Sequence, residues 1–320
     1  IGTISHMLKS TQPQVMLPYS YVKSFAKVSS CEDYYCNDSI DGFPVGSAFI
    51  MPGCKDGTFE NTIDHSREDF RCYYSRIELE TDDIIVESTV TRHVYVYRFS
   101  GANELLLKYP NGSIEICGND IRISIKLQGF ENFINEYVLL RFNSDVNIKS
   151  RGEDACIISV PEYFECYAGV SYISFEKAEQ SICLEVENES FDTIMKKAYN
   201  IWNELLGRVR IEGNSKERQI VFYTALYRAF QRMTNYEEHG EYFSGYDGKV
   251  HQGDFFYTND GLWDTFRCMH PLQLLLDTDR QKDIIESYNI MYQQSGLMPS
   301  FPSIHGDLPV MIGFHAAALF

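Results

Sequence analysis

Carboxylate, histidine and aromatic side chains are concentrated in residues 235–266 of the chain. The ionisable members of this stretch are Glu237, Glu238, His239, Glu241, Asp247, His251, Asp254, Asp260 and Asp264. Carboxylates accept hydrogen bonds from sugar hydroxyls, and aromatic rings pack against the apolar face of a pyranose. The pattern is typical of a sugar-binding site, but a solvated surface loop with structural tyrosines has the same composition.

The sequence YTNDGLWDTFRCMHPLQLLL, residues 257–276, places Asp260, Trp263, Asp264 and Arg267 just ahead of an apolar stretch. A Trp and an Asp at the start of a helix can face a ligand from the loop end of a helical domain. Asp264 could equally cap the helix, which stabilises it by about 1 kcal/mol and has no catalytic role. The spacing alone favours neither interpretation.

The apolar residues of this stretch predict a helix with one buried side. They lie at near-helical spacing and are Leu262, Phe266, Met269 and Leu272. Pro271 is expected to kink or interrupt the helix, because proline lacks an N–H and clashes with the preceding turn. Leu272 and the run Leu274–Leu276 are expected to be buried packing.

A second dense region is LMPSFPSIHGDLPVMIGFH, residues 297–315, whose prolines and glycines predict an irregular loop around His305 and Asp307. A carboxyl group between a histidine and apolar neighbours can be desolvated, and desolvation favours the protonated form that a general acid requires. Asp307 is therefore a candidate general acid, with an ordinary turn aspartate as the alternative.

The net charge limits the partners. The 320 residues carry 28 basic and 45 acidic side chains, a net charge of −17. A field of this sign repels phosphate backbones and anionic membrane surfaces, so we expect neither nucleic acid nor a membrane as a partner. The sequence contains no apolar run of the ~20 residues that a membrane helix needs.

The nine cysteines form no CxxC pair of zinc-site spacing. An odd number of cysteines favours free thiols in a reducing compartment over a disulfide framework, although Cys31 and Cys36 are close enough to pair. Together with the absence of a visible leader, this favours a cytoplasmic location. A removed leader is also compatible with a chain that starts at Ile1.

The first ~185 residues alternate apolar and polar side chains with a period of two, as strands do. Examples are RIELE, IIVESTV, HVYVYRF, IRISIKLQGF and VSYISFE. The clearest hairpin is SIEICGNDIRISIKL, with a turn at Gly118–Asp120. Many short strands with frequent turns predict an antiparallel β-sandwich over residues 1–187.

The apolar period changes to three and four residues at Ser190. The pattern predicts a helix with Ser190 as N-cap and Gly207 as its stop, within a linker at residues 188–212. A second helix is expected from about Ser215. Its predicted apolar stripe is Ile220, Tyr223, Leu226, Tyr227 and Phe230.

A third helix is expected from Thr278 to a stop at Gly296, with Thr278 and Gln281 spaced as a capping box. Long loops rich in Tyr, Asp, Gly and His separate these helices. Residues 213–320 therefore predict a helical domain whose loops carry the chemistry. We expect this segment to be only the first part of that domain.

At these motifs the chain resembles glycoside hydrolase family 92, a family of calcium-dependent exo-acting alpha-mannosidases. The resemblance rests on GYDGKVH, YTNDGLWDTFRCMHPL, YNIMYQQSGLMPSFP and MIGFH, in that order. In the first half it rests on IGT, GFPVGSAFIMPG, TRHVYVYRF, and His65 and Glu68 ahead of Tyr73 and Tyr74. The resemblance implies a β-sandwich, a linker helix and the first helices of an (α/α)6 toroid.

The resemblance further implies hydrolysis of terminal alpha-linked mannose from glycans with inversion, by two carboxylates ~6.5–9.5 Å apart. The acid of the family is a Glu where this sequence has Asp307, and the base and most calcium ligands fall beyond residue 320. No metal ligand is named here for that reason. Trp263, Asp264, Arg267, His305 and His315 are implied to bind the sugar, with Arg267 pairing with Asp264 or Asp260.

Asp307 is one methylene shorter than the Glu of the family, and a misplacement of ~1 Å can cost ~100-fold in rate. The position is compatible with the acid of a variant subgroup, with recognition of another leaving group such as a sugar phosphate, or with an inactive relative. The sequence MLKSTQPQVMLPYS also lacks the glycine-rich stretch common near the start of the family. A sugar phosphorylase and a non-catalytic carbohydrate-binding protein of the same architecture are the alternative functions.

Overall fold

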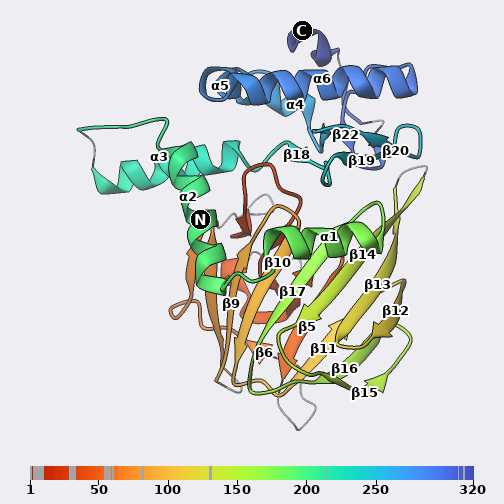
Figure 1. Ribbon diagram of the computed structural model, residues 1–320. Coiled ribbons are helices and arrows are strands. Elements are labelled where there is room, and N and C mark those ends of the chain that lie inside the picture. Colours follow the sequence, from red (N-terminus) through yellow and green to blue (C-terminus); the bar gives the residue numbers. More distant parts are fainter. Residues whose placement is uncertain are drawn as a thin grey trace. The chain divides into compact units, whose positions relative to one another are not determined.

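The structure, a computed structural model, describes residues 2, 11–28, 34–53, 59, 61–80, 83–129, 132–213, 215–308, 310–312 and 314–320 (Figure 1). The chain forms two compact units. The amino-terminal unit comprises Ile1–Leu17, Val22–Lys126 and Asn135–Trp202. The carboxy-terminal unit comprises Pro18–Tyr21, Leu127–Ile134 and Asn203–Phe320.

The amino-terminal unit contains two large sheets. The eight-stranded sheet has the order β12-β13-β14-β17-β10-β9-β8-β7. Its strands are β7 Asp69–Arg71, β8 Tyr74–Leu79, β9 Ile84–Val90, β10 Val94–Ser100, β12 Gly112–Cys117, β13 Asp120–Gln128, β14 Phe133–Phe142 and β17 Tyr163–Ser171. β12 and β13 form the predicted hairpin, and Gly118 occupies the left-handed φ of +65° at its turn.

The second sheet has seven strands in the order β15-β16-β11-β5-β4-β3, with β6 paired to β4. Its strands are β3 Lys27–Val28, β4 Ser39–Val45, β5 Ala48–Gly53, β6 Asn61–Thr62, β11 Glu104–Lys108, β15 Asn147–Arg151 and β16 Ala155–Ser159. The pair β1 Val15–Met16 and β2 Lys23–Ser24 and the short 3-10 helix η1 Tyr34–Cys36 complete the unit's first part.

The two sheets pack face to face, as the alternating pattern predicts. The ring of Phe43 on β4 lies 6.2 Å from that of Tyr97 on β10, and the Tyr97 hydroxyl donates to the Pro44 carbonyl of β4. Both contacts join one sheet to the other through fully buried side chains. The predicted antiparallel sandwich is confirmed.

Helix α1, Phe175–Glu185, corrects the prediction that VSYISFE continues as a strand. β17 ends at Ser171, and Ser174 then caps a helix by accepting a hydrogen bond from the Lys177 N–H. Ala178 and Ile182, four residues apart, pack into the core. A Cβ at Gly169 would lie 2.4 Å from the Ala178 carbonyl oxygen, so this glycine of β17 permits the helix to approach the sheet.

Two of the predicted helices begin and end as their caps indicate. α2, Phe191–Leu206, starts after Ser190, whose hydroxyl accepts from the Thr193 N–H, and stops before Gly207. α3, Lys216–Ala229, starts after Ser215. The stripe predicted for α3 is buried only toward its end, because Ile220 is 57 % exposed whereas Leu226 and Tyr227 are buried.

The carboxy-terminal unit also contains short helices and hairpins. Its further elements are β18 Thr234–Asn235, β19 Glu241–Ser244, β20 Lys249–Gln252, β21 Tyr257–Thr258, α4 Leu262–Thr265, α5 Met269–Leu276, α6 Thr278–Ser295, β22 Pro302–Ser303, β23 Gly306–Asp307 and the 3-10 helix η2 His315–Ala318. The strand-then-helix order confirms the predicted fold class. The predicted domain boundaries and the toroid stay predictions.

Two predictions for this unit are wrong. The helix after Gly261 is interrupted at residues 266–268 and not at Pro271, which lies in the first turn of α5, where a proline is tolerated. The run Leu274–Leu276 is not buried packing, since Leu275 is 82 % exposed, and α5 instead buries His270 and Gln273.

The capping box predicted for α6 is also wrong. The Thr278 hydroxyl donates to the Leu274 carbonyl at the end of α5, and Gln281 turns toward His270. The hydroxyl is used by the preceding helix because only Asp277 separates α5 from α6. The predicted stop is confirmed, with Gly296 in the left-handed conformation at φ 76°.

The cysteines of the described residues are free thiols, as predicted. They are Cys36, Cys72, Cys117, Cys156, Cys166, Cys183 and Cys268. Cys31, the other member of the considered pair, lies outside the described residues. The cytoplasmic location stays a prediction. Among the helices described, none is long and apolar enough to cross a membrane.

Candidate active site

The acid-rich stretch 235–266 folds into two small strand pairs, β18 with β21 and β19 with β20. Tyr242 stacks on Phe256 at 4.5 Å between ring centroids. Glu237, Glu238 and Asp260 are buried. The stretch is therefore not a solvated loop, which was the alternative to a binding site.

Asp260 is the centre of a buried polar network in the carboxy-terminal unit. Its Oδ1 accepts from the Thr265 hydroxyl at 2.8 Å. Its Oδ2 accepts from the Tyr288 hydroxyl at 2.8 Å and lies 2.8 Å from His270 Nε2. The His270 Nδ1 is in turn within 3.1 Å of Gln281 Nε2. The network joins α4, α5 and α6 directly beneath the turn that carries Trp263 and Asp264.

This network also affects the charge states of its members. Burial, together with the neighbouring Asp260, raises the pKa of Tyr288 well above its ordinary value. Tyr288 is consequently a neutral donor throughout the physiological range. A buried carboxylate with three partners is satisfied, and this arrangement fixes the geometry of the turn.

Trp263, Asp264 and Arg267 lie on the exposed side of the same turn. Trp263 is 38 % exposed. The Arg267 guanidinium donates to the Trp263 carbonyl, and its carbon lies 4.9 Å from the Trp263 ring and 4.4 Å from the Phe266 ring. The expected pairing of Arg267 with Asp264 or Asp260 is not observed. Arg267 contacts Trp263 and Phe266 instead, and Asp260 is enclosed by its three other partners.

Asp307 is exposed and held by three donors. Its Oδ1 accepts from the Phe301 N–H at 2.7 Å and the Ser300 N–H at 3.0 Å. Its Oδ2 accepts from the Ser300 hydroxyl at 3.2 Å. The carboxylate is thus fixed in position by the loop before β22. It is not enclosed by apolar neighbours, so the desolvation expected from the sequence is not observed.

Contacts connect the Asp307 loop to the Trp263 turn. The Asp260 N–H donates to the Pro302 carbonyl at 3.1 Å. A Cβ at Gly261 would lie 3.0 Å from the Asp264 carboxylate and 3.1 Å from the Phe301 ring. The Phe301 ring therefore contacts the Trp263 turn, and the Phe301 N–H donates to Asp307. The two regions predicted from the sequence thus lie together.

The two predicted histidines differ in their surroundings. His305 lines a hollow of about 170 Å³ together with Asp307, and burial lowers the pKa of its imidazole. His315, on η2, stacks on Phe266 at 4.4 Å, and its Nε2 lies 3.1 Å from the Ile312 carbonyl oxygen. His315 is thus beside the Trp263 turn, whereas His305 is beside Asp307.

Residues 177–320 match the glycosyl hydrolase family 92 catalytic domain. This segment is therefore similar to the catalytic domain of that family. The resemblance predicted from the sequence motifs is confirmed.

Solved family 92 structures share the fold of the chain. The match to an inverting family 92 mannosidase of Bacteroides thetaiotaomicron covers 100 % of this chain and 51 % of the mannosidase chain, with 24 % identity and a TM-score of 0.87. The match to a family 92 alpha-mannosidase of the same organism, solved in complex with mannoimidazole, covers 96 % of this chain and 50 % of the mannosidase chain. The identity is 18 % and the TM-score is 0.85.

A third family 92 glycosyl hydrolase structure covers 91 % of this chain and 49 % of its own, with 19 % identity and a TM-score of 0.77. The chain spans about half the length of these relatives. No curated protein matches the chain.

Several residues of this segment were missed by sequence reasoning. His270, Tyr288 and Gln281 form the network around Asp260, and Tyr246 lines the hollow beside Asp307. His270 and Tyr246 stand inside the quoted motifs YTNDGLWDTFRCMHPL and GYDGKVH, which was the available signal. Tyr288 lies 28 positions after Asp260, a separation that no local sequence pattern covers.

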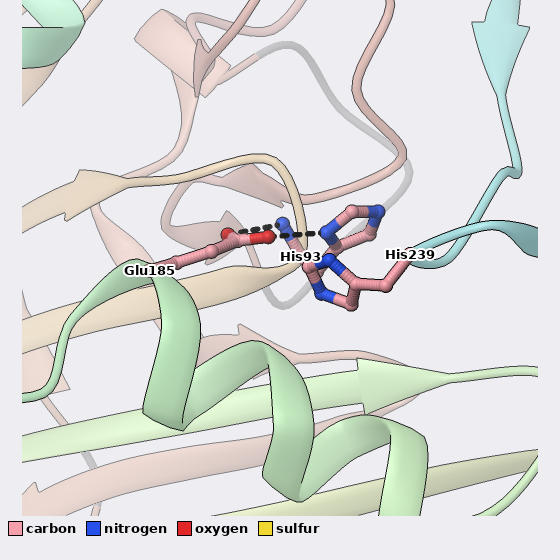
Figure 2. Close-up of side chains that lie close together, drawn as sticks. All are labelled: His93, Glu185 and His239. Carbon is pink, nitrogen blue, oxygen red and sulfur yellow. Dashed lines mark hydrogen bonds and ion pairs between the residues drawn. The ribbon is translucent and has the colours of Figure 1, made fainter. Parts of the chain in front are cut away.

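The amino-terminal unit contains a second acid and histidine pair, in which His93 is buried and Glu185 is partly buried. Figure 2 shows the Glu185 carboxylate, at the end of α1, directed at His93. Glu185 accepts from the His93 backbone N–H at 3.1 Å and also pairs with its Nδ1. His93 is the histidine of TRHVYVYRF, so the pair accounts for one of the motifs that carried the resemblance.

Proposed function

We propose that the chain is the amino-terminal portion of a glycoside hydrolase that removes terminal alpha-linked mannose from glycans. The family 92 match supports a glycosidase, and the solved relatives described as mannosidases support the sugar. The observation that carries the proposal is the position of Asp307. Three donors fix its carboxylate, and Phe301 connects it to the turn that exposes Trp263 and Asp264.

Asp307 is the proposed general acid of an inverting reaction. Two backbone N–H groups occupy Oδ1, so the proton of the acid form belongs on Oδ2. The partner of Oδ2 within the described residues is the Ser300 hydroxyl, which can rotate to accept as well as donate. An inverting enzyme also needs a second carboxylate ~6.5–9.5 Å away to activate water, which is proposed to follow residue 320.

The Trp263 turn is the proposed contact for the terminal mannose. The exposed Asp264 carboxylate accepts sugar hydroxyls, and the half-exposed indole packs beside the ring. Arg267 holds the indole through its contacts with the Trp263 ring and carbonyl. The buried Asp260 network keeps this turn from shifting when the sugar binds.

Calcium is the proposed cofactor, because the resemblance to family 92 implies it. Calcium takes six to eight oxygen ligands in most proteins. Within either unit taken by itself, the described part of the chain brings no three His, Cys, Asp or Glu ligand atoms together.

The proposal is tested by mannose release from mannobiose by the full-length protein, with and without a chelator. We expect release that the chelator abolishes, and a loss of about 100-fold or more in Asp307→Asn, because the amide cannot donate the acid proton. Asp279→Asn, a surface substitution on α6, is the control. Mannoside binding without turnover would instead establish a non-catalytic carbohydrate-binding protein, and a requirement for phosphate would establish a phosphorylase.

A further inference from the structure

The hollow beside Asp307 is built by two glycines that let two turns approach each other. A Cβ at Gly245 would lie 2.2 Å from the Ile304 carbonyl oxygen and 2.8 Å from the Gly306 nitrogen. Gly306 itself adopts a φ of +109°, which favours glycine. The turn after β19 therefore packs against the β22–β23 hairpin, and Tyr246 comes to lie on the same hollow as His305 and Asp307.

Two polar atoms at this hollow are buried and have no hydrogen-bond partner within the described ranges. They are the Tyr246 hydroxyl and His305 Nδ1. Buried polar atoms are nearly always paired in folded proteins, so an unpaired one often marks a position completed by water or a ligand. Gly129 also makes room here, since a Cβ at this position would lie 2.6 Å from His305 Nδ1.

The side chains of the hollow suit a neutral, hydroxylated ligand. Its polar residues include Asn132, Tyr246, Ser295 and His305, and Leu297 and Leu308 add apolar surface. Burial and the nearby Asp307 charge raise the Tyr246 pKa, which keeps the phenol a neutral donor. The lining residues are neither Lys nor Arg, so the hollow offers no cationic side chain to bind an anion.

We propose that this hollow is a subsite for one neutral sugar residue on the leaving-group side of the bond, with Tyr246 as a hydrogen-bond donor to that sugar. The proposal rests on the proposed function, because a general acid must reach the leaving oxygen and Asp307 forms part of the wall. The volume of about 170 Å³ is below the ~300–1,000 Å³ of pockets for larger ligands, so it suits a single ring. A phosphate-bearing leaving group is disfavoured by the same lining.

The test compares two substrates of the full-length protein in Tyr246→Phe, which removes only the hydroxyl. Mannobiose places a sugar in the subsite, whereas alpha-mannosyl fluoride releases fluoride and leaves the subsite empty. We expect kcat/KM for mannobiose to fall about 5- to 10-fold, the value of one lost hydrogen bond, and that for the fluoride to change less than about 2-fold. Tyr163→Phe, at an exposed tyrosine of the amino-terminal unit, is the matched control.

Equal losses on both substrates, or no loss on either, would overturn the subsite. Faster cleavage of a mannose joined through phosphate than of mannobiose would overturn its neutral character. An inactive wild type would refute the proposed function alone, and titration calorimetry with mannobiose then decides the subsite. Weaker binding to Tyr246→Phe supports the subsite, and equal or absent binding overturns it. The melting temperature of the variant is expected to be unchanged or higher, since the hydroxyl it removes is unpaired.

Discussion

Each of the two units contains a carboxylate paired with a buried histidine, and the two pairs differ in which parts of the chain they connect. His93 and Glu185 join the turn before β10 to the end of α1, within the amino-terminal sandwich. Asp260 and His270 belong to a larger set with Thr265 and Tyr288, beneath the turn that exposes Trp263. The same type of side-chain pair therefore connects a strand to a helix in one unit and supports candidate sugar-binding residues in the other.

The two carboxylates also differ in the chain segments that supply their donors. Glu185 receives donors from the segment just before β10, namely the backbone N–H and ring of His93 and the side chain of Thr91. Asp260 receives hydrogen bonds from three different elements of the chain, so its position is overdetermined. A site that must place an indole and a carboxylate against a sugar gains from such rigidity, because small displacements reduce rate strongly.

The largest expected effect is from Asp260→Ala. Removal of this carboxylate leaves the buried donors of Thr265, His270 and Tyr288 without their acceptor. We expect a loss of about 3–5 kcal/mol in the free energy of unfolding of the carboxy-terminal unit, measured by urea denaturation. Asp279→Ala, at a side chain 94 % exposed, is the control. A loss below about 1 kcal/mol would show that the network is not the support inferred here.

Glu185→Gln is expected to have the next largest effect, about 1–3 kcal/mol, because one donor of His93 loses its charged acceptor. Burial tends to raise the pKa of Glu185, but the hydrogen bond and charge of His93 outweigh it and lower the pKa below 4.5. The pair thus contributes stability that is complete above pH 4.5 and is lost as the pH falls through the lowered value. Melting temperatures from pH 3 to 7 should be flatter for the variant, and equal slopes would contradict the pairing.

Glu136→Gln should have a smaller effect of the opposite sign. Burial raises the pKa of Glu136 above 4.5, although Ser47 and Tyr172 donate to it. Its contribution is therefore present below pH 4.5 and is lost as the pH rises through the raised value. The neutral amide should raise stability at pH 8 by up to about 1 kcal/mol and give no gain at pH 4, as measured by thermal melts. A gain at both pH values would mean that packing, not ionisation, is responsible.

Asp264→Asn should have the smallest effect on stability, within about 0.5 kcal/mol, because the side chain is exposed. Its expected effect on mannose release is larger, about 10-fold or more in kcat/KM, if the carboxylate accepts a sugar hydroxyl. The contrast with Asp260→Ala separates the residue that binds from the one that supports. Unchanged release by the folded variant would remove Asp264 from the proposed site.

Local signals in the sequence predicted the sandwich and most helix ends, because caps act over only a few residues. Ser190, Gly207, Ser215 and Gly296 lie where expected. The partner of the Thr278 hydroxyl could not be predicted in this way. Because only Asp277 separates α5 from α6, the hydroxyl can reach the last turn of α5, and it donates to the Leu274 carbonyl there. Prediction from spacing failed where the competing partner lies outside the window that defines the cap.

The support for the candidate site could not be read from the sequence for a similar reason. Asp260 meets His270 after 10 positions and Tyr288 after 28, and only the packing of α4, α5 and α6 brings them together. The resemblance to family 92 supplied Trp263, Asp264 and Asp307 because motifs preserve residue order. The resemblance did not predict that Asp307 is exposed. It also did not predict that Tyr246 lies beside Asp307, which depends on the close contact of Gly245 with Gly306.

The positions of the two tryptophans give each unit its own fluorescent reporter. Trp202 is 1 % exposed and donates to the Met16 carbonyl in the amino-terminal unit, whereas Trp263 is 38 % exposed in the carboxy-terminal unit. A buried indole emits at shorter wavelength than one in contact with water. Replacing either ring with phenylalanine leaves a single emitter, so the unfolding of sandwich and helices can be followed separately, and sugar docking is expected to alter only the signal from Trp263.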